Sequence, residues 1–186
     1  MIRLANELHV AILDPIVHHF HVVARAPFSH PIATRSSIFR SSRNALKNGR
    51  VGEAASLLGR PYSLSGIVVR GNRIGHSIGF PTANIRIPES YKLIPSEGVY
   101  VARFVFAGKS YNSMVSIGRR PTLESHGKLS IEAHVLDFND DLYGAVVSVY
   151  LLEKLRDNIR FQDLDALKSQ LQIDRQATME FFKQQP

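Results

Sequence analysis

Five runs rich in β-branched and aromatic residues follow one another through the middle of the chain, with no helical pattern between them. Gly, Pro, Asn and Asp separate these runs, as expected for strands joined by turns. Parallel strands need a crossover, usually a helix, and none is indicated here. We therefore expect a mainly β fold, either an antiparallel barrel or a sandwich. The runs are Ser65–Arg70, Gly98–Phe106, Tyr111–Ile117, Leu129–Phe138 and Ala145–Glu153.

Helical patterns flank this β region on both sides. Upstream, Ser41–Gly49 predicts a short capped helix that ends at a glycine, and Val51–Gly59 repeats the design with its apolar residues on one face. Downstream, Asp163–Phe182 predicts one bent helix or two consecutive helices, with Asp163 and Asp174 as caps. The β region is thus expected to be preceded by a short helical segment and followed by a C-terminal helix.

The net charge of +7 is concentrated near the N-terminus. Residues 1–60 carry eight Lys and Arg against three acidic residues, whereas the remaining residues carry 15 basic and 13 acidic side chains. A protein that binds a phosphate backbone needs a basic face on its folded body. A solvated basic arm is the simpler interpretation, so we expect no nucleic-acid partner, and a nucleic-acid-binding module remains an alternative that this arm suggests.

Composition and missing motifs exclude several classes of protein. No apolar run is long enough to cross a bilayer, so no membrane association is expected. The chain has no cysteine, which excludes disulfides and thiolate metal sites and fits a reducing, cytoplasmic location. The P-loop, the G-x-S-x-G elbow and H-E-x-x-H are all absent.

Three glycines, Gly71, Gly75 and Gly79, lie four residues apart just before a short extended segment. Their spacing does not fit the G-x-G-x-x-G pattern of a phosphate-binding turn. By spacing alone, turn glycines are a simpler interpretation than a cradle for phosphate groups.

The extended segment that follows carries Pro81, Thr82 and Asn84. Thr82 and Asn84 are two residues apart, so they lie on the same face of a strand. A hydroxyl and an amide carbonyl suit Mg²⁺ when phosphate oxygens complete its octahedron, so the pair could form a site that needs a nucleotide. By spacing alone, an Asx or Ser/Thr turn after the proline explains these residues better.

A single carboxylate lies in the middle of an apolar strand. Alternation along Leu129–Phe138 puts Glu132 and His134 on one face, and the opposite face carries Ile131, Ala133, Val135 and Asp137. A carboxylate in this setting costs free energy unless it is paired or serves as a base. Spacing alone supports equally a general base and a glutamate on the solvated face of an edge strand.

In combination, these segments resemble the signature blocks of the riboflavin kinase family. Each block alone is weakly specific, but together they cover about residues 62–183 in the family's order. The blocks are Gly66–Ile85, Gly98–Tyr100, Ser116–Thr122, Glu132–Phe138, Asp141–Gly144 and Leu155–Asp157 with Phe161.

The resemblance implies a small six-stranded antiparallel Greek-key β-barrel with a C-terminal α-helix. It implies transfer of the ATP γ-phosphate to the 5′-hydroxyl of riboflavin to give FMN, with Mg²⁺ as the metal, so that riboflavin/FMN and ATP/ADP are the expected partners. Residues 61–186 would form the kinase domain. Residues 1–60 would be a partly disordered remnant of the adenylyltransferase domain or linker found in bifunctional enzymes, and its nucleotide-binding signature is absent. We expect a monomer.

The resemblance also assigns roles to single residues. Glu132 would be the catalytic base, Thr82 and Asn84 would hold Mg²⁺, and Arg156 would lie near the flavin. His76 stands where bacterial members usually have Arg, which removes a charge near the phosphates. A catalytically idle flavin- or nucleotide-binding barrel with a regulatory role is the alternative. The residues expected to bind substrate or nucleotide are Gly71, Gly75, His76, Gly79, Pro81, Thr82, Asn84 and Arg156.

Overall fold

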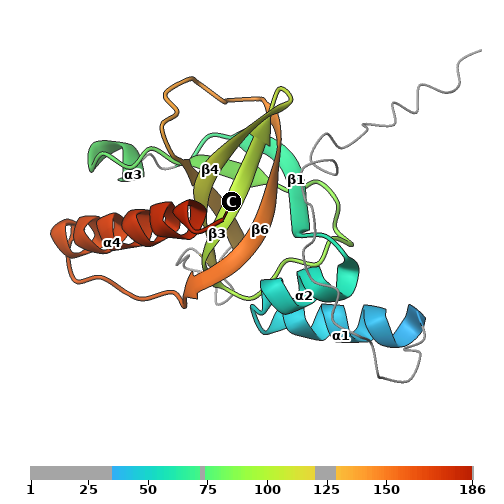
Figure 1. The fold of residues 1–186 in the computed structure, drawn as a ribbon. Coiled ribbons are helices and arrows are strands. Elements are labelled where there is room, and N and C mark those ends of the chain that lie inside the picture. The colour runs from blue at the N-terminus through green and yellow to red at the C-terminus, as the bar shows by residue number, and fades with distance from the viewer. Residues whose placement is uncertain (1–34, 72–73, 120–128, 186) are drawn as a thin grey trace, which may run out of the picture. The chain divides into compact units, whose positions relative to one another are not determined.

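The computed structural model describes residues 35–71, 74–119 and 129–185 of the chain, all within one compact unit. In these residues six strands form a closed barrel in the order β1-β2-β5-β4-β3-β6, with every neighbouring pair antiparallel (Figure 1). Strand β6 returns beside β3 after the β3–β4–β5 meander, which is a Greek-key connection. The expected barrel is therefore confirmed. The strands are β1 (Tyr62–Val69), β2 (Ala83–Arg86), β3 (Gly98–Phe106), β4 (Lys109–Arg119), β5 (Leu129–Val135) and β6 (Val146–Arg156).

The barrel encloses one hydrophobic core. Alternation along each strand places every second side chain inside, and the largest fully buried side chains include Tyr100, Phe104, Leu64, Ile117 and Leu151. The five β runs of the sequence all form strands, and the sixth strand, β2, is the short extended segment after Pro81.

The predicted alternation over Leu129–Phe138, which put Asp137 on one face with Ile131, Ala133 and Val135, is wrong at Asp137. The strand ends at Val135, and Asp137 is exposed in the following turn with a φ of 54°. The alternating pattern stops there because the chain no longer pairs with a neighbouring strand.

Two helices precede the barrel, α1 (Arg35–Lys47) and α2 (Val51–Leu58). Helix α1 begins well before the predicted Ser41. Ser42 lies inside the helix, and its hydroxyl donates to the Phe39 carbonyl at 3.1 Å. The predicted ends are confirmed, because Gly49 and Gly59 both adopt a φ of 73° after the last turn. Both helices contribute to the barrel's hydrophobic cluster, through Ala45, Leu46, Val51 and Ala54.

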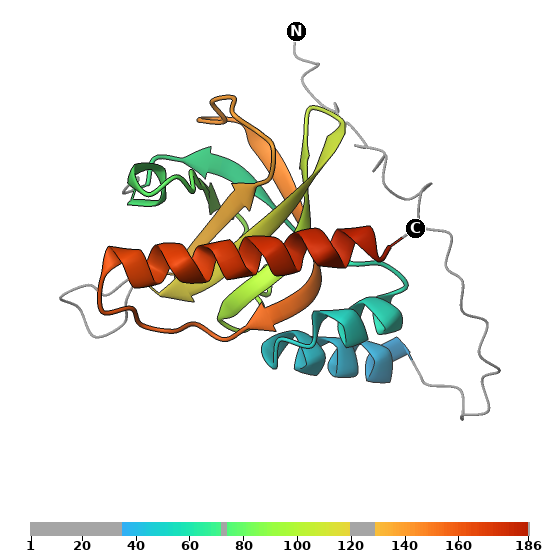
Figure 2. The ribbon, with the colours of Figure 1, turned by 60° about the vertical axis from the view of Figure 1, so that its left-hand side comes forward.

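The C-terminal region is a single helix, α4 (Leu164–Lys183), lying across the outside of the barrel against β4 (Figure 2). Asp163 caps it as predicted, accepting a 2.7 Å hydrogen bond from the Ala166 amide. The predicted cap at Asp174 is wrong, because the helix continues through this residue and its carboxylate is buried in an ion pair with Arg156. None of the described helices is long and apolar enough to span a membrane.

Candidate active site

Pairing between β2 and β5 brings Thr82, Asn84 and Glu132 together. Asn84 lies opposite Glu132 in the ladder, and the Thr82 hydroxyl donates to Oε2 of Glu132 at 3.2 Å. The other carboxylate oxygen accepts a 3.0 Å hydrogen bond from the hydroxyl of Ser130. Since β5 is flanked by β2 and β4, Glu132 is on an interior strand and its carboxylate is partly buried and paired. The edge-strand interpretation of Glu132 does not fit this geometry.

A cavity of about 460 Å³ opens beside this ladder. The chain leaving β1 and the segment entering β2 line one part of it, and the β5–β6 connection lines another. The cavity brings together five of the residues that the sequence assigned to nucleotide binding, namely Gly71, His76, Pro81, Thr82 and Asn84.

The three glycines are required for different local reasons. A Cβ at Gly71 would overlap the side-chain amide of Asn84, so this amide can occupy its observed position only because residue 71 has no side chain. A Cβ at Gly75, in the short helix α3 (Ile74–Ser77), would overlap the Phe80 carbonyl. Gly79 has a φ of 84°, which favours glycine. Gly75 and Gly79 are not among the described residues that line the cavity, and their assignment to nucleotide binding remains a prediction.

The β5–β6 connection supplies cavity residues to which the sequence assigned no role. The Arg70 guanidinium stacks 4.9 Å from the centre of the Tyr143 ring, and both residues line the cavity. The Asp141 carboxylate accepts a 2.9 Å hydrogen bond from the Tyr143 amide, forming an Asx turn, and Gly144 follows it with a φ of 79°. The turn residues Asp141 and Gly144 were the available signal, but the stacking partner lies far away in the sequence.

His134 was also assigned no role. The residue is only 9% exposed, and Nδ1 of its ring lies 2.8 Å from the carbonyl oxygen of Pro81. Burial lowers the pKa of the His134 imidazole, the bond to Pro81 opposes this shift, and the charge of Arg175 adds to it. The side chain is therefore neutral around pH 7.

Arg156 lies at the end of β6 and is not among the described residues that line the cavity. Its Nε and Nη2 donate to the Asp174 carboxylate at 2.9 and 2.7 Å, and its Nη1 donates to the Asp157 carbonyl at 3.0 Å. This guanidinium therefore fastens α4 to the barrel. Its predicted position near the flavin stays a prediction.

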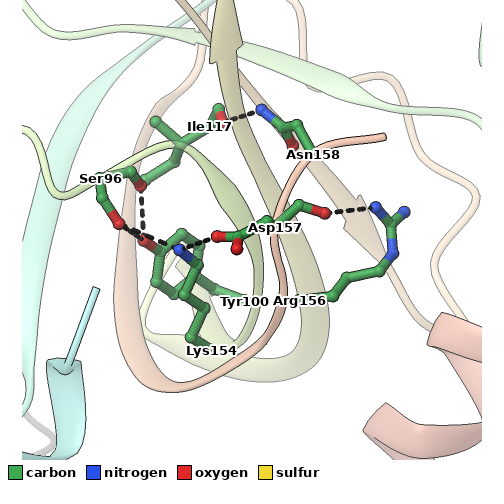
Figure 3. A network of polar contacts seen from close by, with 7 residues as sticks. All are labelled: Ser96, Tyr100, Ile117, Lys154, Arg156, Asp157 and Asn158. Atoms are coloured by element: carbon green, nitrogen blue, oxygen red, sulfur yellow. Dashed lines mark hydrogen bonds and ion pairs between the residues drawn. The ribbon is translucent and has the colours of Figure 1, made fainter. Parts of the chain in front are cut away.

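The turn after β6 is further held by a polar network (Figure 3). The Lys154 ammonium contacts the Asp157 carboxylate at 2.5 Å and the Ser96 hydroxyl at 3.2 Å, and Tyr100 also bonds to Ser96. On the opposite side of the turn, Asn158 donates to a carbonyl of β4 at 2.9 Å. The position of Arg156 is thus fixed from both directions.

The donor set suits a metal that is bound together with phosphate. The described residues contain no group of three or more His, Cys, Asp or Glu that could hold a metal ion. Thr82 and Asn84 offer a hydroxyl and an amide, which are neutral oxygen ligands of the kind that Mg²⁺ accepts. The Thr82 hydroxyl donates its proton to Glu132 and so keeps lone pairs for a cation. These residues fit Mg²⁺ when further oxygens come from a nucleotide.

Comparison with known proteins identifies the family. Residues 58–182 match the family model described as Flavokinase: Riboflavin kinase. The bifunctional riboflavin kinase/FMN adenylyltransferase of Listeria monocytogenes is 41% identical over 140 residues, covering 75% of this chain and 44% of that protein. The Bacillus subtilis protein of the same description is 37% identical over 142 residues, covering 75% and 45%. The chain belongs to the riboflavin kinase family.

One solved structure shares the fold closely. A crystal structure described as a macrolide-efflux protein from Streptococcus pneumoniae matches with a TM-score of 0.71 and 37% sequence identity, covering 75% of this chain and 45% of the other. The chain spans less than half the length of the curated relatives quoted above.

Proposed function

We propose that this chain is a riboflavin kinase, which transfers the γ-phosphate of ATP to the 5′-hydroxyl of riboflavin in the presence of Mg²⁺. The observation that carries the proposal is the contact between Thr82, which lines the cavity, and Glu132, which lies behind it and is not among the described residues that line the cavity. This contact places a candidate metal ligand and a candidate base side by side. Phosphoryl transfer needs positioning, neutralisation of charge and a proton acceptor, and this arrangement offers all three.

The nucleotide would occupy the cavity of about 460 Å³ with its phosphates toward Thr82 and Asn84. Mg²⁺, when bound with the nucleotide, would neutralise charge on the phosphate oxygens that these two side chains help to hold. Gly71 would contribute by leaving room for the Asn84 amide. The Arg70–Tyr143 pair offers a flat surface on which a base could stack.

Glu132 would accept the proton of the riboflavin 5′-hydroxyl as that oxygen bonds to the γ-phosphorus and the bond to ADP breaks. Hydrogen bonds from Thr82 and Ser130 hold the carboxylate in place before substrate arrives. No observation on the described residues favours the alternative of an idle barrel.

The test is an assay of the purified chain with riboflavin, ATP and MgCl₂, with separation of the flavins by chromatography. We expect ATP-dependent formation of FMN that stops when EDTA removes the metal. A chain that binds riboflavin and ADP but forms no FMN would support the idle-barrel alternative instead.

A further inference from the structure

We propose that His134 is a positioning residue for nucleotide binding, which holds the Pro81 carbonyl and thereby fixes Thr82 at the phosphate end of the site. This inference rests on the proposed riboflavin kinase function and deepens it. His134 bonds to the carbonyl of Pro81, which directly precedes the candidate metal ligand Thr82, so it acts on the site through the backbone.

The chain enters β2 through two residues that lie outside the β2–β5 ladder. The ladder between β2 and β5 begins with the pair Ala83 and Ala133, so Pro81 and Thr82 lie ahead of it. Proline has no backbone N–H to donate to a ladder. Two side chains of β5 hold these residues instead, as Glu132 accepts from the Thr82 hydroxyl at 3.2 Å and His134 bonds to the Pro81 carbonyl at 2.8 Å.

His134 is itself rigidly placed. It lies in the middle of the barrel wall, opposite Met114 of β4, and is 9% exposed. Its ring packs on Phe80 with 5.2 Å between the ring centres, and the Phe80 amide donates to the Gly75 carbonyl at 2.7 Å. One buried ring thus ties the segment from Gly75 to Thr82 to the barrel.

The protonation state of His134 suits its contact with Pro81. The Pro81 carbonyl can only accept a hydrogen bond, so Nδ1 of His134 carries the proton and donates. Burial and the nearby charge of Arg175 on α4 favour the neutral imidazole. The contact with Pro81 therefore requires a neutral hydrogen-bond donor at the position of Nδ1. An amide side chain of suitable length can supply this donor, whereas a hydrocarbon side chain cannot.

The test compares three substitutions in the full chain. His134→Asn places an amide N–H near the position of Nδ1, whereas His134→Gln places it near Nε2, and His134→Leu has no donor. Ile131→Val is the control, since Ile131 is buried on the opposite face of the same strand and its truncation destabilises the core without touching Pro81. For each protein, the affinity for ADP with Mg²⁺ is measured by calorimetry, together with kcat, both KM values and the melting temperature.

We expect His134→Leu and His134→Gln to weaken Mg²⁺-ADP binding and to raise the KM for ATP, each by about 5- to 100-fold. The lower limit corresponds to the loss of one hydrogen bond, and the upper limit, about 100-fold, to a misplaced reactive group. His134→Asn should stay within about 3-fold of the parent, since a neutral hydrogen bond of this kind contributes modestly. The KM for riboflavin should change least. If the Leu variant does not fold, the contrast between Asn and Gln gives the same test.

Two results would overturn the inference. One is unchanged nucleotide affinity in both His134→Leu and His134→Gln. The other is a loss of nucleotide affinity that is proportional to the decrease in melting temperature in every variant, Ile131→Val included. That result would show that His134 has a purely structural role. A parent protein that neither binds Mg²⁺-ADP nor forms FMN would reject the proposed function, and the inference with it, and is recognised before any variant is compared.

Discussion

The hydroxyl of Thr82 donates a hydrogen bond of 3.2 Å to the carboxylate of Glu132, which lies fifty residues further along the chain. The two residues were assigned to different tasks, metal binding and proton transfer, and pairing of β2 with β5 makes them direct neighbours. Because β5 is an interior strand of a closed barrel, this pairing cannot slide without moving Ala133 out of the core. The site is therefore as rigid as the barrel wall that carries it.

Substitution of Gly71 by Ala should damage the site more than the fold. A Cβ at this position would overlap the Asn84 amide, while Gly71 itself has no left-handed backbone to strain. We expect Mg²⁺-ADP affinity to fall by about 10- to 100-fold, as for the loss of a hydrogen bond to a charged group. Calorimetry measures this. Gly108→Ala is the matched control. Gly108 has a φ of 75°, so alanine is expected to destabilise the β3–β4 turn, and an added Cβ there would have no atom within 4 Å. Equal effects of both substitutions on affinity would contradict the prediction.

Substitution of Asp174 by Ala should destabilise the protein. Asp174 is 2% exposed, and its carboxylate accepts hydrogen bonds from two nitrogens of Arg156. Removing the carboxylate therefore leaves a largely buried guanidinium without its main acceptor. The free energy of unfolding should fall by about 3–5 kcal/mol, measured by urea titration. Asp157→Ala, which removes an exposed carboxylate paired with Lys154, is the control and should change stability little. A stable Asp174→Ala protein would show that the ion pair does not hold α4 to the barrel.

Removal of the first 34 residues should have a much smaller effect on stability than removal of helices α1 and α2 as well. Helices α1 and α2 bury Ala45, Leu46, Val51 and Ala54 in the barrel's own cluster, and each Leu or Val contributes about 1.5–3 kcal/mol by burial. We expect residues 35–186 to melt cooperatively and to keep kinase activity, and residues 61–186 to lose several kcal/mol or fail to fold. Thermal unfolding followed by circular dichroism checks both. A fully stable 61–186 fragment would instead support a domain boundary at residue 60.

Binding of Mg²⁺ should depend on the nucleotide. Thr82 and Asn84 are neutral, and the described residues provide no cluster of acidic or imidazole ligands, so the ion needs phosphate oxygens. Calorimetry should show weak binding of Mg²⁺ to the protein alone and much tighter binding with ADP present. Equal affinity in both titrations would contradict the assignment of these two residues.

Local patterns predicted most of the fold because strands and helix ends are set by neighbouring residues. Runs of β-branched and aromatic residues between turn residues located five strands, and Gly49 and Gly59 marked two helix ends. Long-range partners were not predictable in this way. Asp174 resembled a cap because an aspartate before a helical run looks the same whether it binds its own amides or a distant arginine. In the same way, His134 gave no local sign that its partner is Pro81.

At the candidate site, too, local patterns were not sufficient and the long-range contacts became visible only in the structure. Spacing alone left Glu132 and the Thr82–Asn84 pair undecided, and the resemblance to a family proposed their roles. The barrel then showed that they are neighbours. The Arg70–Tyr143 pair could not be foreseen, since neither residue belongs to a pattern that pairs β1 with the β5–β6 connection.

Glu132→Gln tests whether Glu132 is the general base. The amide keeps the size of the side chain and can still accept the Thr82 hydrogen bond through its carbonyl oxygen, but it cannot take up a proton. We expect kcat to fall by about 10²- to 10⁴-fold, the usual contribution of a general base, while Mg²⁺-ADP affinity changes little. Glu153→Gln, on the exposed side of β6, is the control and should behave as the parent. A Glu132→Gln protein with kcat within about threefold of the parent, far below the range for a base, would contradict the claim.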